Sequence, residues 1–198
     1  MHMAKIKTAE NSSKREKILT EASHLFWEKG YKAASMRDLA ARVGVEAASL
    51  YNHISSKGDL LALICGLVAD RFTSFMQEVQ KEDIGTIEKA EKIVRFHVRQ
   101  MVEHYHQVFV TDREWRNLED PHLTETREGR RSYRRSFAAI IQKGIDDNEI
   151  KQVDANTTVM IFLNSINAVD QWHRIIHKVE STELENNMVA ILIGGLKK

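Results

Sequence analysis

The sequence predicts an all-α protein of about nine helices, and two observations carry this prediction. The 198 residues include one proline and nine glycines, and 42% of them are hydrophobic, which suits helices that share a core. Hydrophobic residues also recur at three- and four-residue spacing over most of the chain, which is typical of amphipathic helices.

The first helix is expected to begin at Ser12 or Ser13 and to end near Lys29, because Gly30 follows as a stop signal. The residues before it are polar and lack the pattern of a signal peptide. The core-facing positions of this helix are Ile18, Ala22, Leu25 and Phe26.

Two short helices are expected next, separated by a tight turn. Ser35 is placed to cap the first of them, and Gly44 ends it, where a residue with positive φ is needed. The second begins near Glu46 and runs to His53. Two helices joined by such a turn form a helix-turn-helix, whose second helix can enter the major groove of DNA. The apolar positions of the first helix are Met36, Leu39, Ala40 and Val43.

The string ASLYNHISSKGDLL follows the turn. With the preceding Gly-Val pair it resembles the signature of the tetracycline-repressor (TetR) family of bacterial regulators. Ile54 stands where the family usually has Phe, and Gly58 where Glu is common. The resemblance implies a three-helix DNA-binding domain over residues 1–58 and a larger helical ligand-binding and dimerisation domain over residues 59–198. The matching positions are Gly44, Val45, Ser49, Leu50, Tyr51, His53, Lys57 and Leu60.

The residues expected on DNA fall into two groups. Arg37 is the best candidate for reading a guanine, because its guanidinium can donate to both O6 and N7. Glu46 either accepts from a cytosine amine or stabilises the start of its own helix. The group expected at base edges is Arg37, Ala47, Ala48, Ser49 and Asn52. The group expected at phosphates is Ser35, Tyr51, His53 and Lys57.

Charge and cysteine content set further bounds. Residues 1–58 hold ten Lys/Arg against six Asp/Glu, a net charge of +4, whereas the rest of the chain sums to −3. A basic N-terminal lobe suits attraction to phosphate at one end. Cys65 is the only cysteine, which precludes an intrachain disulfide and fits the cytoplasm; it either packs in an apolar run or senses redox state. No apolar run reaches the roughly 18–20 residues that span a membrane.

Longer helices should follow the helix-turn-helix. They are expected over residues 56–81, 86–110, 123–147, 154–178 and 182–193, with a short piece around 114–118 before Pro121. The family resemblance implies that the first of them transmits a ligand signal to the DNA-binding lobe. It also implies that the last two pair with a second copy of the chain, and a homodimer is what a palindromic operator demands.

Two features of the larger lobe bear on a small-molecule effector. Asp170, His173 and His177 share one face of the helix over residues 154–178, where they line either a cavity or the dimer seam. In the run TREGRRSYRRSF, Arg130 falls within the apolar sector and Arg134 at its edge. The run is either a solvated face or the entrance of a site for a ligand with a phosphate-bearing head. The expected effector contacts are Met101, Tyr105, Arg130, Tyr133, Arg134, Phe137, Phe162, Ile166, Asp170 and His173.

The C-terminal half resembles TetR relatives that respond to acyl-coenzyme A thioesters, through the motifs YRRSF, IxxGI, VDA and QWHR. The resemblance implies an acyl-CoA effector. A free fatty acid or another lipophilic small molecule is the alternative.

The sequence offers little support for other classes of function. It has no Gly-rich phosphate loop and no nucleophile elbow, so we expect no enzyme and no cofactor. The pair His173 and His177 has metal-ligand spacing, but no Glu follows His173, and no metal site is expected. The remaining alternative is a helical protein–protein adaptor that does not bind DNA.

Overall fold

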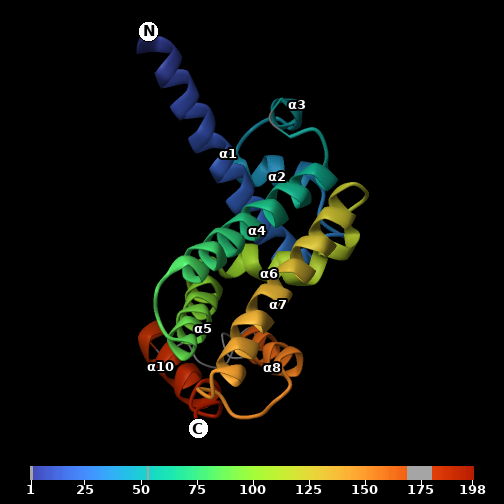
Figure 1. The fold of residues 1–198 in the computed structure, drawn as a ribbon. Coiled ribbons are helices and arrows are strands. Elements are labelled where there is room, and N and C mark those ends of the chain that lie inside the picture. Colours follow the sequence, from blue (N-terminus) through green and yellow to red (C-terminus); the bar gives the residue numbers. More distant parts are fainter. Residues whose placement is uncertain (1, 53, 169–179) are drawn as a thin grey trace. The chain divides into compact units, whose positions relative to one another are not determined.

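The computed structural model describes residues 2–52, 54–168 and 180–198 (Figure 1). Apart from an isolated bridge between Ile150 and Lys197, the regular structure in these ranges is helical, which confirms the all-α prediction. The helices are α1 His2–Lys29, α2 Met36–Val43, α3 Ala47–Tyr51, α4 Lys57–Lys81, α5 Thr86–Glu103, α6 Tyr105–Glu114, the 3₁₀ helix η1 Trp115–Asn117, α7 His122–Asp146, α8 Ala155–Asn167 and α10 Ser181–Leu192. No helix within the described ranges is long and apolar enough to cross a membrane.

The chain packs into two compact units. The first holds the residues up to Val68 together with His106–Thr126, and the second holds Ala69–Tyr105 and Arg127–Lys198. Helices α4 and α7 therefore contribute residues to both units. This division follows packing, and the functional boundary at residue 58 stays a prediction.

The first unit has its own hydrophobic core. Apolar side chains from α1, α2, α3 and the start of α4 meet there and exclude water from about fifteen side chains. Cys65 is buried in this core, as its apolar neighbours predict. The largest fully buried residues here are Leu25, Leu39, Leu50, Leu60, Leu61 and Ile64.

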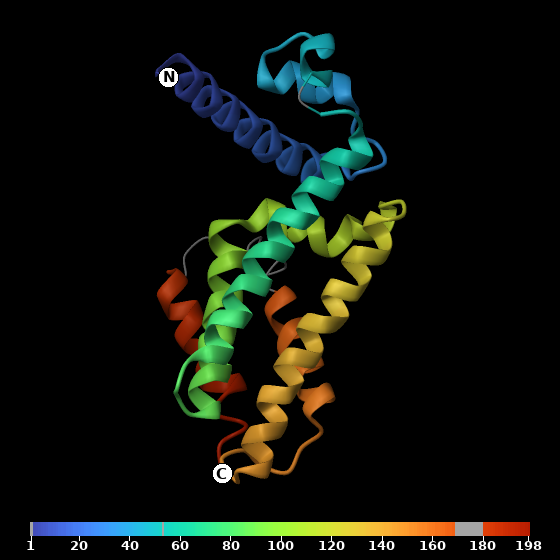
Figure 2. The ribbon, with the colours of Figure 1, turned by 45° about the horizontal axis from the view of Figure 1, so that its top comes forward.

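The second unit is organised around α5, which packs against α10 and α8 (Figure 2). Glu185 of α10 is buried and accepts a hydrogen bond from Arg99 of α5, with 3.0 Å between Nε and Oε1. Gly144 of α7 is tightly enclosed: a Cβ atom there would lie 2.6 Å from the Cδ1 atom of Ile150. Such contacts hold the helices of this unit in one arrangement.

Three helix boundaries differ from the prediction. Helix α1 begins at His2, ten residues or more before the predicted start, because Met, Ala, Lys and Glu, which recur in this segment, have high helix propensity. The helix predicted over residues 86–110 is two helices, since His104 leaves helical geometry at φ −123° and ψ 33°. Helix α8 ends at Asn167, and residues 169–178 of the predicted helix lie outside the described part.

Candidate functional site

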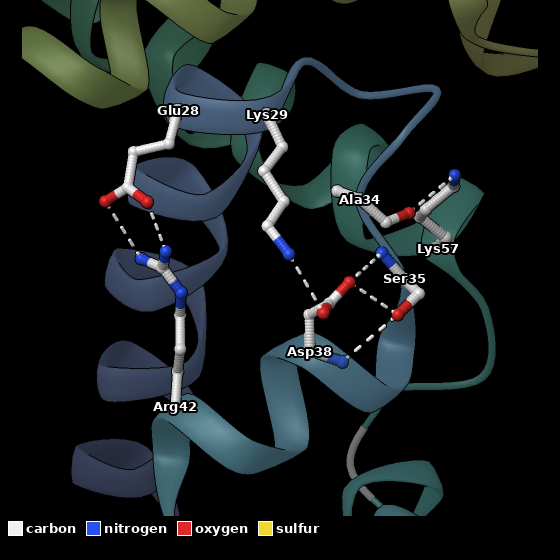
Figure 3. Close-up of polar contacts among 7 residues, drawn as sticks. All are labelled: Glu28, Lys29, Ala34, Ser35, Asp38, Arg42 and Lys57. Carbon is white, nitrogen blue, oxygen red and sulfur yellow. Dashed lines mark hydrogen bonds and ion pairs between the residues drawn. The ribbon is translucent and has the colours of Figure 1, made fainter.

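The start of α2 is fixed by a capping box, as Figure 3 shows. The Oγ atom of Ser35 accepts from the N–H of Asp38 at 3.1 Å, and the Asp38 carboxylate accepts from the N–H of Ser35 at 3.0 Å. The Ser35 hydroxyl also donates to Asp38 at 2.6 Å, and Lys29 adds an ion pair at 3.0 Å. The bonds from Ser35, with help from Lys29, lower the pKa of Asp38 to about 2. The carboxylate thus stays charged and keeps this turn in place.

The end of α2 is fixed as well. Gly44 has φ 79° and ψ 36°, and its N–H donates to the carbonyl of Ala40 at 3.0 Å. This is the left-handed conformation that favours glycine, so the predicted turn is confirmed. Arg42 forms a two-bond ion pair with Glu28 that joins α2 to α1 (Figure 3). The first half of the helix-turn-helix is therefore held at both ends.

Helix α3 is short and has one anchor. Leu50 is fully buried in the core of the first unit, and Ala47 packs partly against the same core. Glu46 is the N-cap residue, but its side chain makes no capping hydrogen bond. Ala48, Ser49 and Asn52 are exposed to solvent, and so is Arg37 of α2. The predicted base-reading group is thus largely open to solvent.

The residues predicted at phosphates are in different situations. Tyr51 is 52% exposed. The hydroxyl of Ser35 is engaged in the capping box. The ammonium group of Lys57 donates to the carbonyls of Tyr31, Lys32 and Ala34, contacts that the sequence did not predict. His53 lies outside the described residues.

A second candidate site lies within the second unit, where aromatic rings surround a polar pair made of the buried His97 and the half-buried Tyr133. The Nε2 atom of His97 is 2.7 Å from the hydroxyl of Tyr133. The ring of Phe72 lies edge-on to His97 at a centroid distance of 4.7 Å, and Phe75 stacks on Phe96 at 3.9 Å. We refer to Phe72, Phe75, Phe96, His97 and Tyr133 as the aromatic cluster.

The polar members of this cluster are uncharged near neutral pH. Burial lowers the pKa of His97 to about 3, and burial raises the pKa of Tyr133. Gln100 lies three residues beyond His97 on α5 and is only 7% exposed, and its Oε1 atom has no hydrogen-bond partner among the described residues. An unsatisfied buried acceptor costs about 1–3 kcal/mol, so this amide needs an explanation.

The predicted effector residues are only partly brought together. Phe137 and Phe162 are buried with ring centroids 6.0 Å apart. Arg130 is half-buried, as its place in the apolar sector predicts, whereas Arg134 is exposed on α7. Asp170, His173 and His177 lie outside the described residues. The other buried members of the predicted set are Met101, Tyr105 and Ile166.

The prediction missed most of this region: the three phenylalanines of the aromatic cluster, and the polar residues His97, Gln100 and Arg71. His97 and Gln100 sit between apolar residues of the α5 stripe, and polar side chains at those positions were the available signal. Arg71 of α4 is half-buried, and burial lowers the pKa of its guanidinium. Burial lowers the pKa of His104 as well, with a contribution from the positive charge of Arg71.

Both halves of the chain match family models of known proteins. Residues 18–64 match a family model described as bacterial regulatory proteins, tetR family, and residues 83–196 match the tetracyclin repressor-like C-terminal domain. A similar relative is the HTH-type transcriptional repressor KstR2 of Mycolicibacterium smegmatis, 22% identical over 98% of this chain and 96% of the relative.

Solved structures share the fold. The ketosteroid transcriptional regulator KstR2 of Mycobacterium tuberculosis has a TM-score of 0.87 at 19% identity, over 93% of this chain and 95% of that one. AibR in complex with isovaleryl coenzyme A and operator DNA has a TM-score of 0.81 at 21% identity, over 91% and 98% of the two chains.

Proposed function

This chain belongs to the TetR family of bacterial regulatory proteins, and we propose that it is a repressor that binds a palindromic operator as a homodimer and leaves it when a small lipophilic effector binds. The observation that supports DNA reading most is the doubly capped α2 beside an α3 whose outer side chains are exposed. A reading surface held at both ends loses little conformational entropy on docking.

The proposed base contacts come from α2 and α3. Arg37 reads a guanine through two hydrogen bonds, and Asn52 pairs with an adenine. Ala48 and Ala47 offer methyl groups to thymine, with Ala47 the more constrained because it packs partly on the core. Ser49 adds a hydroxyl that donates or accepts. The strongest phosphate contact is the exposed Tyr51, since the other two described candidates are engaged within the protein.

The proposed dimer surface is formed by α8 and α10. Met160 and Ile161 of α8 are 56% and 54% exposed, and Ile191 of α10 is 70% exposed. Large apolar side chains with such exposure on the C-terminal helices suit burial against a second copy. Two copies related by a two-fold axis would place one α3 on each half of a palindrome.

The effector is proposed to be an acyl-CoA thioester held in the second unit. The aromatic cluster offers apolar surface, and the unsatisfied amide oxygen of Gln100, three residues beyond His97 on α5, offers a neutral acceptor for a hydroxyl or amide N–H of the ligand. Arg71 and Arg130 are half-buried cations that suit phosphate or carboxylate. AibR, which shares the fold, was solved with isovaleryl coenzyme A. A free fatty acid or another lipophilic molecule remains the alternative.

Release requires that the effector prefer the arrangement that does not bind DNA. Helix α4 is the proposed carrier of the signal, because Phe72 and Phe75 belong to the aromatic cluster and Lys57 begins the same helix.

The effector proposal is tested by titrating acyl-CoAs of increasing chain length into the complex with a labelled duplex selected from a random library. Release by some chain lengths, with none from coenzyme A alone, is the expected result. Release by free fatty acids at equal potency would favour the alternative, and no release by any thioester would end the acyl-CoA proposal.

Gln100→Leu should raise the acyl-CoA concentration needed for half-release about tenfold, while the control Gln142→Leu, at an exposed position of α7, should leave it unchanged.

A further inference from the structure

The side chain of Lys57 reaches back from the first turn of α4 to the loop between α1 and α2 (Figure 3). Its Nζ atom lies 3.0 Å from the carbonyl oxygen of Tyr31, 3.2 Å from that of Lys32 and 2.9 Å from that of Ala34. The ammonium also stands 4.6 Å from the centroid of the Tyr31 ring. An ammonium group has three protons, so all of them are engaged within the protein.

These contacts offset an unfavourable position of Lys57 in its own helix. A cation in the first turn of a helix is opposed by the helix dipole, so Lys57 weakens α4 by itself. Three carbonyl oxygens that converge on one point carry partial negative charges that repel one another, and a buried or half-buried carbonyl needs a donor. The ammonium meets both needs. The loop can keep the conformation in which these three carbonyl oxygens converge because the ammonium group of Lys57 donates to all of them.

The loop that Lys57 holds leads directly into the reading surface. Ala34 precedes Ser35, which caps α2 through the bonds with Asp38. Gly30 opens the loop in the left-handed conformation, with φ 76°, and accepts from the N–H of Ala34 at 3.2 Å. The path from Lys57 to the first turn of α2 thus runs through one residue, whose carbonyl is the nearest partner of the ammonium.

We infer that Lys57 is a positioning residue that sets the orientation of α2 through the loop, and that it does not serve as a phosphate contact. This inference rests on the proposed DNA binding and extends it: the same lysine ties the first turn of α4, the proposed carrier of the effector signal, to the helix-turn-helix. To reach a phosphate, the ammonium would have to give up at least one carbonyl that has no other described donor.

The test compares Lys57→Met with Lys32→Met and Lys57→Arg. Lys32 is exposed in the same loop, so its substitution removes the same charge and leaves the three carbonyl contacts in place. Arg keeps a cation with several donors at position 57. Two readouts are measured for each variant: deuterium exchange at the amides of Ala34, Ser35 and Asp38, and affinity for a duplex selected from a random library by the wild-type protein, as a function of salt.

Positioning predicts that Lys57→Met speeds exchange at these three amides and weakens binding about tenfold or more, at a temperature where circular dichroism shows the variant folded. The slope of log affinity against log salt should stay at the wild-type value, and Arg should restore much of both properties. Lys32→Met should leave exchange unchanged.

Two results would overturn the inference. Unchanged exchange, together with a salt slope about 0.9 shallower than that of the wild type, would make Lys57 a phosphate ligand. Faster exchange with unchanged affinity would leave it a stabilising residue only. If Lys57→Met does not fold, Lys57→Arg must keep slow exchange and wild-type slope, and failure of either rejects the inference. Wild-type protein that binds no duplex would reject the proposed function, while the exchange readout still tests the carbonyl contacts.

Discussion

At the scale of single residues, the two candidate sites differ in kind. The side chains proposed to face DNA are mostly exposed, and the atoms that fix the ends of α2 belong to Ser35, Asp38 and Gly44. The second site is the reverse, because His97 and Tyr133 are polar groups kept among aromatic rings. A buried polar group is retained against a desolvation cost, so it is where substitution is most informative.

Arg37→Ala should relax preference at one base pair. Loss of a two-bond contact to guanine removes about 1–3 kcal/mol of discrimination at that position and leaves preferences elsewhere unchanged. Tyr51→Phe removes a hydroxyl proposed to hold phosphate, and it should weaken all sequences by a similar factor. Affinities for every single-base variant of a selected duplex measure both patterns. The assignments are reversed if Tyr51→Phe changes base preference and Arg37→Ala does not.

His97 should make stability depend on acidity. Burial holds its pKa at about 3, below the ordinary 6.5, so between these values the unfolded chain binds a proton that the folded chain does not. The free energy of unfolding should fall as the pH drops from about 6.5 toward 3, and this contribution is complete above 6.5. His97→Gln should have a flatter curve in that window, measured by urea unfolding. The exposed His122→Gln is the control, and parallel curves for wild type and His97→Gln would contradict the expected burial.

At the scale of helices, residues that begin or end a helix could be predicted directly from the sequence. Ser35 and Gly44 bracket α2 by backbone chemistry that any helix obeys, and both were predicted and confirmed. The break at His104 could not be predicted, because apolar spacing continues across it and neither Gly nor Pro marks it. The reach of Lys57 to carbonyls 23 to 26 residues away is a tertiary contact with no local signature. The pairing of His97 with Tyr133, 36 residues apart, has none either.

Two glycines of α7 should respond oppositely to alanine. A Cβ atom at Gly144 would lie 2.6 Å from Ile150 Cδ1 and 2.9 Å from Thr86 Cγ2, so Gly144→Ala should lower stability by about 1–3 kcal/mol. Gly129 has open space around it, and Gly129→Ala should raise stability by about 0.5–1 kcal/mol through helix propensity. Thermal unfolding measures both, and a stabilising Gly144→Ala would show that this packing is looser than described.

At the scale of the whole molecule, the proposed function depends on a second copy of the chain. A single helix-turn-helix reads only half of a palindrome, and two copies multiply affinity without new contacts because the second half-site binds at high effective concentration. Family membership follows from the whole pattern of motifs, whereas the effector depends on side chains in a lobe whose sequence motifs are less specific. The helix-turn-helix was therefore easier to predict from sequence than the effector site.

Ile161→Asp should convert the proposed dimer to a monomer. The Ile161 side chain is 54% exposed on α8. An aspartate at this position would bury a carboxylate at the two-fold interface opposite the same carboxylate of the second copy, and the two negative charges would repel each other. Sedimentation equilibrium should show a single-chain mass, and affinity for a selected duplex should fall at least about a hundredfold. Val102→Asp, at an exposed apolar position of α5, is the control and should remain dimeric. A dimeric Ile161→Asp with full affinity would place the interface elsewhere.

The most direct test of DNA reading by a two-fold pair is selection of duplexes from a random library, followed by weighing the complex by light scattering. Binding by a two-fold pair should select an inverted repeat with half-sites about one helical turn or a multiple of it apart, bound by two chains per duplex. Enrichment of no sequence, or of an asymmetric site bound by a single chain, would contradict it.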